Sequence, residues 1–136
     1  MSLRLSVVTP SRSVVETDAD SVVAPGSEGE FGVLPGHAPL LAALRPGVLT
    51  FSVGGRESRL ALGGGFAEVT QERVTVLAPS AEAPDKIDAT EAEARRANAA
   101  RALDEAGVAA PLEEVAQLRE ALERAQARVD VLRGPV

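Results

Sequence analysis

The chain has 136 residues, of which 45% are hydrophobic and only 2% aromatic, and its formal net charge is −6. The lack of Trp and Tyr excludes the aromatic platforms on which single-stranded nucleic acids stack, and the acidic balance disfavours nucleic-acid partners of any kind. The lack of Cys excludes disulfides, thiol catalysis and thiolate metal sites.

Membrane and export signals are missing from the sequence. No apolar run approaches the roughly 20 residues that a membrane-spanning helix requires. The first thirteen residues are too few and too polar for a signal peptide, and a strand-like alternation begins already at Leu3. We therefore expect a soluble protein that stays in the compartment where it is made.

The first part of the chain, to about Ala78, has the pattern of short β-strands. Apolar side chains alternate with period two, and paired residues suited to tight turns, Gly54-Gly55 and Gln71-Glu72, separate the apolar runs. This pattern is typical of an antiparallel sandwich or barrel. The predicted strands are Leu3–Val7, Val14-Val15, Ser21–Ala24, Val48–Val53, Ser58–Leu62, Phe66–Thr70 and Arg73–Ala78.

The segment Gly26–Gly47 is rich in Gly and Pro, yet apolar residues are interleaved through it. We interpret it as a loop that is shaped by its glycines and prolines and pinned to the sandwich by its apolar side chains, so that it presents one fixed contact surface. Glu28, Glu30 and His37 would be left to meet a partner. The predicted anchors are Phe31, Val33, Leu34, Leu40 and Leu41.

The second part of the chain predicts two helices after a linker at Pro79–Pro84. Asp88 suits the N-cap of a first helix over Ala89–Ala106, Glu91 stands at the capping-box position, and Gly107 suits its end. Pro111 suits the first turn of a second helix that should run to about Arg133, before Gly134-Pro135. The short break between them predicts an antiparallel helical hairpin.

The two predicted helices would pack through an apolar seam, and the first helix contributes mainly small side chains to it. The second helix offers a heptad stripe, whereas the first helix offers mainly alanines and is interrupted by Arg96. Because alanine burial stabilises much less than leucine burial, the hairpin could leave the sandwich at modest cost. A two-state arm is therefore a hypothesis. The two faces are Val115, Leu118, Leu122, Ala125, Val129 and Leu132 on the second helix and Ala89, Ala92, Ala99, Leu103 and Ala106 on the first.

Catalytic and metal sites find little support in the residues. His37 is the only histidine, and nothing marks a serine nucleophile or a cluster of metal ligands. Gly63-Gly64-Gly65 lacks the Lys-Ser or Lys-Thr of a phosphate loop and is interpreted as a turn where backbones approach closely. The helical arginines alternate with acids, which is typical of a solvated surface and leaves docking open as the alternative. We expect no enzyme activity, no metal and no cofactor.

A family resemblance rests on the string from Gly26 to Leu41, GSEGEFGVLPGHAPLL, followed by Arg45-Pro46-Gly47. With these residues and the order of the elements, the chain resembles the epsilon subunit of bacterial F-type ATP synthase over its whole length. Supporting matches are Leu5–Pro10, Leu62–Phe66, Val74–Ala78 and Ile87-Asp88.

The resemblance implies a non-catalytic subunit of the central stalk, peripheral to the cytoplasmic face of the bacterial plasma membrane. Residues 1–84 would form a sandwich that binds gamma and the ring of c subunits and helps couple proton flow to ATP synthesis. The ring would face Ser27, Glu28, Glu30 and Phe31, and His37 would lie near gamma.

The same resemblance implies that residues 85–136 form a regulatory hairpin. Extended, this hairpin would reach the alpha and beta subunits and inhibit ATP hydrolysis, with Arg119, Arg124 and Arg128 meeting an acidic loop of beta. Membrane contact would come only through the complex.

Two alternatives remain open. Some members of the family bind ATP through a motif that matches Ile87, Asp88 and Ala92 here, but Glu91 and Asn98 stand where the family has arginines. Loss of two arginines and gain of an acid predict weak ATP binding or none, unless Arg95 substitutes. The other alternative, a small all-β enzyme or ligand-binding barrel, lacks the His, Asp or Tyr cluster that would line its pocket.

Overall fold

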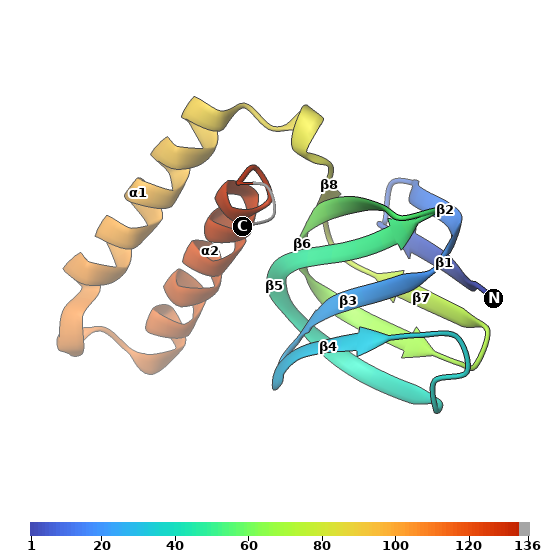
Figure 1. Cartoon of the computed structure of the whole chain (residues 1–136). Coiled ribbons are helices and arrows are strands. Elements are labelled where there is room, and N and C mark those ends of the chain that lie inside the picture. Colours follow the sequence, from blue (N-terminus) through green and yellow to red (C-terminus); the bar gives the residue numbers. More distant parts are fainter. Residues whose placement is uncertain (134–136) are drawn as a thin grey trace.

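The computed structural model describes residues 1–133. They form an N-terminal β-sandwich followed by an antiparallel pair of helices, which confirms the predicted fold class (Figure 1). The elements are β1 (Leu3–Val8), β2 (Ser13–Ala19), β3 (Ser21–Gly26), β4 (Gly29–Val33), β5 (Leu40–Val53), β6 (Arg56–Val69), β7 (Arg73–Leu77), β8 (Ala81–Glu82), the short 3-10 helix η1 (Pro84–Lys86), α1 (Ala89–Ala106), η2 (Gly107–Ala109) and α2 (Leu112–Asp130).

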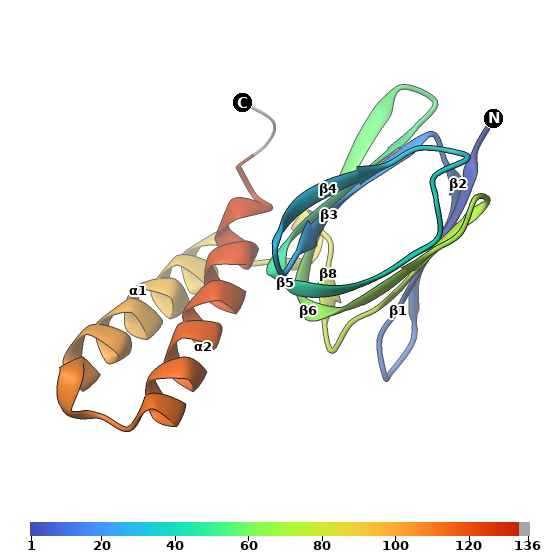
Figure 2. The same cartoon turned by 90° about the horizontal axis from the view of Figure 1, so that it is seen from below.

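The strands follow the order β2-β1-β7-β6-β5-β3-β4, with β8 added beside β6. Only β1 and β7 pair in parallel; the other pairings of the described residues are antiparallel. The long strands β5 and β6 serve both layers, because Phe66–Val69 of β6 pairs with β7 whereas Ala61 and Leu62 pair with β8. Figure 2 shows the strands curving around an enclosed interior.

Aliphatic side chains fill this interior. In β1 the inward positions Leu3, Leu5 and Val7 are fully buried, as their period-two spacing predicts. The β5–β6 hairpin supplies Leu49 and Leu62, both almost fully buried. Because the core contains one phenylalanine, Phe51, and no larger aromatic, its stability depends on close packing of Val, Leu and Ala.

The triple glycine lies within β6, so its interpretation as a turn is wrong. Gly63 and Gly65 pair across the sheet with Pro46 and Leu44 of β5. The other half of that interpretation, close backbone approach, is confirmed. A Cβ on Gly65 would lie 2.1 Å from the carbonyl oxygen of Leu77, and a Cβ on Gly63 would lie 2.4 Å from Ser80 Oγ. The glycines let the chain that leaves β7 cross closely over β6.

Substitution of Gly65 should destabilise the sandwich strongly. Gly65 has φ +124°, which L side chains rarely adopt, and an added Cβ would meet backbone rather than a movable side chain. We expect Gly65→Ala to lower the free energy of unfolding by about 3 kcal/mol or more, measured by urea denaturation. Gly32→Ala is the matched control, because a Cβ there meets no atom within 4 Å. Equal stability of the two variants would contradict this role of Gly65.

Local signals set the limits of α1 as predicted. The Asp88 carboxylate accepts a hydrogen bond from the backbone N–H of Glu91 (2.9 Å), and Gly107 ends the helix with φ +58°. The linker prediction is wrong in part, because Ala81 and Glu82 pair with β6 and Pro84 begins η1. The second helix ends at Asp130, three residues before the predicted limit. Gly134-Pro135 lies outside the described residues.

The hairpin packs beside the sandwich through α2, with α1 on the far side of α2 (Figures 1 and 2). The residues of the seam between the helices are less buried than the heptad stripe predicts. Val129 is buried, but Val115, Leu118, Leu122, Ala125 and Leu132 are only half-buried and Ala89 is exposed. Tight packing is confined to one end, where a second small core joins the sandwich to both helices. Its buried members are Ala61, Ile87, Ala92, Ala127, Val129 and Val131.

Candidate functional site

The segment Gly26–Gly47 is mostly strand rather than loop. It contains the turn into β4, the connection of residues 34–39 and the first half of β5. Its predicted anchoring is only partly right. Val33 is buried and Phe31 packs against the core, but Leu34, Leu40 and Leu41 are 63%, 39% and 73% exposed. The pleat of β5 turns Leu44 inward and leaves Leu41 on the outer face.

One of these leucines, Leu41, belongs to a row of outward apolar residues that crosses four strands. The strand register sets Ala43 of β5 opposite Phe66 of β6, Phe66 opposite Leu77 of β7, and Leu77 opposite Val8 of β1. Leu41 lies two residues before Ala43, so it projects from the same face. We call these five residues the outer apolar patch: Val8, Leu41, Ala43, Phe66 and Leu77.

The patch leaves large side chains in solvent. Phe66 is 56% and Leu77 is 55% exposed, although the chain has only three phenylalanines. A shallow groove runs along its edge, lined by Val8, Thr9, Pro10 and the stretch Leu77–Pro79 as well as Phe66. Contiguous exposed apolar surface on a chain of this size is typical of a protein–protein contact. Phe66 and Leu77 were not among the sequence-predicted site residues, because alternation alone does not say which face of a strand is outside.

The polar candidates of the segment lie at opposite ends of β4. Ser27, Glu28 and Glu30 are exposed at the turn between β3 and β4, and half-buried Phe31 closes this turn against the core. His37 lies in the connection after β4, where its Nδ1–H donates to the carbonyl oxygen of Ala38 (2.6 Å). Glu30 is the second residue of β4, so the three strand residues 31–33, about 10 Å of strand, lie between it and the connection that carries His37. We therefore treat the two groups as two contact points rather than one site.

The three candidate arginines of α2 differ in their surroundings. Arg119 is exposed and forms no ion pair within residues 1–133. Arg124 pairs with Glu120 one turn earlier in the same helix (2.8 Å), which is an ordinary surface pair. Arg128 is different, because its side chain is only 19% exposed and it contacts two other elements. The structure therefore does not bring the three together as one site.

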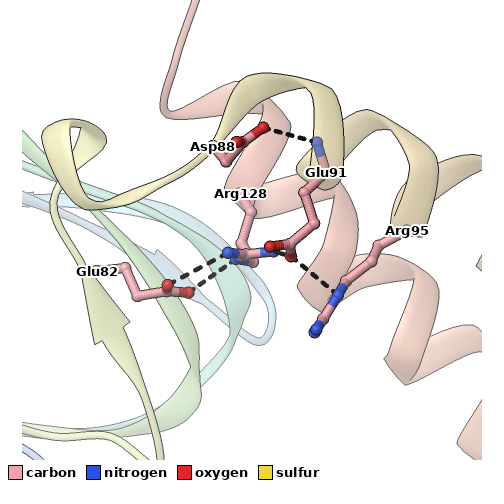
Figure 3. Close-up of polar contacts among 5 residues, drawn as sticks. All are labelled: Glu82, Asp88, Glu91, Arg95 and Arg128. Atoms are coloured by element: carbon pink, nitrogen blue, oxygen red, sulfur yellow. Dashed lines mark hydrogen bonds and ion pairs between the residues drawn. The ribbon is translucent and has the colours of Figure 1, made fainter.

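Arg128 lies at the centre of a cluster that joins β8, α1 and α2 (Figure 3). Its guanidinium donates to both carboxylate oxygens of Glu82 (2.9 and 3.4 Å) and to Glu91 (3.3 Å). Glu91 also pairs with Arg95 (3.0 Å). Burial by itself lowers the pKa of Arg128, but the hydrogen bonds to Glu82 and Glu91 outweigh it, so the pKa is raised and the side chain stays charged. No local pattern around Glu82, Glu91 or Arg128 predicts this cluster.

The candidate nucleotide-binding residues have structural roles in the described fold. Ile87 and Ala92 are buried in the second small core, and the Asp88 carboxylate caps α1. A groove of about 490 Å³ does open between β6 and the two helices. Its lining includes Arg95, Asn98, Arg124 and Arg128, but none of the three candidates. The Glu91 carboxylate engages two of these arginines.

No helix of residues 1–133 combines the length and the apolar character that crossing a bilayer requires.

Comparison with known proteins gives a consistent answer about family. The model of the ATP synthase delta/epsilon chain β-sandwich domain matches residues 2–84. The ATP synthase epsilon chain of Syntrophobacter fumaroxidans is 43% identical over 129 residues, which cover 95% of this chain and 94% of that protein. That of Nitratidesulfovibrio vulgaris is 45% identical over 132 residues, covering 96% and 95%.

Solved structures share the fold at lower identity. A chain of the Euglena gracilis mitochondrial ATP synthase assembly of OSCP, F1 and c-ring superposes with a TM-score of 0.81 at 22% identity, covering 97% of this chain and 82% of that one. A chain of the Tetrahymena thermophila central stalk and c-ring superposes with a TM-score of 0.62 at 15% identity, covering 97% of both. The strands, the helical pair and the sequence identity agree, and the chain therefore belongs to the family of ATP synthase epsilon chains.

Proposed function

We propose that the chain is a non-catalytic rotor subunit that fastens gamma to the c-ring and so helps couple proton translocation to ATP synthesis. The observation that carries this proposal is the outer apolar patch. A chain that leaves Phe66 and Leu77 in solvent has a surface suited to a permanent partner, and a chain of the same fold is part of a solved central-stalk and c-ring assembly. Gamma is the partner that we assign to the patch, with His37 at its margin.

The contact with the ring is assigned to the turn between β3 and β4. Ser27, Glu28 and Glu30 form an exposed polar tip, which suits the polar loops of a c-ring rather than an apolar surface. Phe31 packs behind this tip and holds its shape. In this arrangement the sandwich meets gamma with the outer face of one layer and the ring with one end of β4, on the cytoplasmic side of the bacterial plasma membrane.

The helical pair is assigned the role of a brake on ATP hydrolysis. In the described state it lies against the sandwich, and the small core beneath it contains three buried residues larger than alanine: Ile87, Val129 and Val131. So little apolar burial favours a reversible contact. On extension, Arg119, Arg124 and Arg128 would reach an acidic loop of beta, within the alpha–beta assembly.

Coupling itself is tested by adding the chain back to vesicles that contain ATP synthase depleted of it. We expect ATP-driven proton uptake to be lost on depletion and restored on addition, because the rotor contact is broken and then re-formed. Uptake would be followed with a pH-sensitive dye, and the Gly32→Ala chain serves as a folded control. Equal uptake with and without the chain would contradict the coupling role.

ATP sensing is the alternative, and we expect ATP to bind poorly. The carboxylate of Glu91 pairs with Arg95 and Arg128, so a phosphate entering this groove would meet both a competing partner and a repelling charge. Isothermal titration of ATP into the isolated chain should give a Kd on the order of 1 mM or weaker. A micromolar Kd would overturn this expectation and favour the nucleotide-sensing function.

A further inference from the structure

Arg128 occupies the one place in residues 1–133 where the sandwich and both long helices meet through charged side chains. Glu82, its first partner, belongs to β8 and therefore to the sandwich, whereas Glu91 belongs to α1 (Figure 3). Arg128 itself belongs to α2. In sequence, these carboxylates lie 46 and 37 residues before Arg128. Within residues 1–133, each of the other ion pairs in the helical region joins residues only three or four positions apart.

The surroundings make these contacts stronger than ordinary surface pairs. The side chains of Arg128 and Glu82 are 19% and 34% exposed, and two hydrogen bonds join them in a forked arrangement. Ala127 and Val129, on either side of Arg128, are buried in the second small core and hold the helix backbone in place. Because that core is small, the ion pairs of Arg128 add to a limited apolar contact between the hairpin and the sandwich.

We propose that Arg128 is the lock of the compact hairpin. Its hydrogen bonds to Glu82 and Glu91 must break before the helices can leave the sandwich. Two consequences follow, the second resting on the proposed braking function. Loss of either carboxylate shifts the hairpin toward extension. In addition, Arg128 cannot hold the compact state and contact an acidic loop of beta at the same time, so it changes carboxylate partners when the brake engages.

The lock is tested on the isolated full-length chain by distance measurements between two spin labels. The chain has no Cys, so labels attached at Glu57→Cys on the sandwich and Glu105→Cys on α1 are the only thiol adducts. We expect Glu82→Gln and Glu91→Gln each to raise the ratio of extended to compact hairpin about fivefold, and the double variant to raise it further. Glu93→Gln is the matched control, because within residues 1–133 the ion pair of Glu93 is with Arg96 of its own helix and not with the sandwich.

Ionic strength supplies a second readout that a merely structural role would not move. At about 1 M NaCl the parent chain should extend more, since screening weakens the ion pairs of Arg128, whereas the double variant should respond little. An unchanged distance distribution in the double variant, with circular dichroism like that of the parent, would overturn the lock.

A third measurement, the ATP hydrolysis rate of the assembled complex, distinguishes the lock from the proposed braking function. In the assembled complex the double variant should hydrolyse ATP more slowly than the parent, because more hairpins are extended. If the labels report extension but hydrolysis is unchanged, the lock stands and the braking function fails. If neither the labels nor hydrolysis respond to the double substitution, the lock fails while the brake is tested by removing the hairpin.

Discussion

Ending the chain after Pro84 should raise the ATP hydrolysis rate of the assembled complex several-fold. The truncation removes both helices, including Arg119, Arg124 and Arg128, so nothing remains that could extend into the alpha–beta assembly. The sandwich should survive, because its main core contains no helical residue. Of the second small core, the sandwich residues that the truncation would uncover are Ala61 and half-buried Val48. Hydrolysis would be measured on purified complex at saturating ATP.

The truncation experiment requires proof that the shortened chain is still present. Co-purification with the complex, followed by quantitation of the subunit bands, supplies this control, since the outer apolar patch lies wholly within the retained residues. ATP-driven proton uptake should also persist, because the contacts assigned to gamma and the ring are untouched. A truncated chain that is fully incorporated yet leaves hydrolysis at the parent rate would show that this hairpin is not a brake.

Placing an acid in the outer apolar patch should abolish assembly without unfolding the chain. Phe66 is 56% and Leu41 is 73% exposed in the free chain, so Phe66→Asp or Leu41→Asp removes little buried surface on folding. In a complex with gamma the same side chain would be covered, and a carboxylate there would be desolvated without a partner. We expect the affinity for gamma to fall about 100-fold for each variant, measured by biolayer interferometry.

The matched control for this prediction is Val53→Asp. Val53 is an exposed apolar residue of the same strand as Leu41 (40% exposed), but it lies at the far end of β5, beside the Gly54-Gly55 turn. Val53→Asp adds the same charge outside the patch, and it should leave the affinity for gamma within about twofold of that of the parent chain. Unfolding in urea should show that all three variants are folded before the transition. Equal loss of affinity in Val53→Asp would show that added charge, rather than the patch, is responsible.

The helices could be predicted closely because their limits depend on neighbouring residues. The Asp88 cap and Gly107 act within one turn of the positions they define, so no distant contact is needed to read them. The strand class was predicted for a similar reason, since the alternation in β1 and the Gly54-Gly55 turn are local signals. The strand count was wrong, because β4 and β8 were missed and the predicted strands Ser58–Leu62 and Phe66–Thr70 both fall in β6. Family membership followed from the long string of Gly26–Leu41, which is specific in order and not only in composition.

The predictions that failed depend on contacts between distant parts of the chain. Gly65 looks like a turn residue until the carbonyl of Leu77 is placed 2.1 Å from where its Cβ would be. Leu40 and Leu41 are adjacent and equally apolar, so only the register of β5 decides that Leu41 faces solvent. The local sequence around them is compatible with either leucine facing solvent.

The charged cluster shows the same limit at a candidate functional site. In the sequence, Glu91 is a departure from the family pattern near a nucleotide motif, and Arg128 is one helical arginine among several. The 3.3 Å contact between them and the bond from Arg128 to Glu82 arise only when α2 folds back along α1 and against β8. Side chains that meet across such distances in sequence have no common local signal.

The central claim, that the outer apolar patch holds the sandwich to gamma, is tested most directly by site-specific crosslinking in the assembled complex. Because the parent chain lacks Cys, a photoreactive group can be attached at Phe66→Cys or, as the control on the opposite end of β5, at Val53→Cys. We predict a crosslinked product containing gamma from position 66 and none from position 53. A gamma product from position 53 alone would contradict the assignment of the patch.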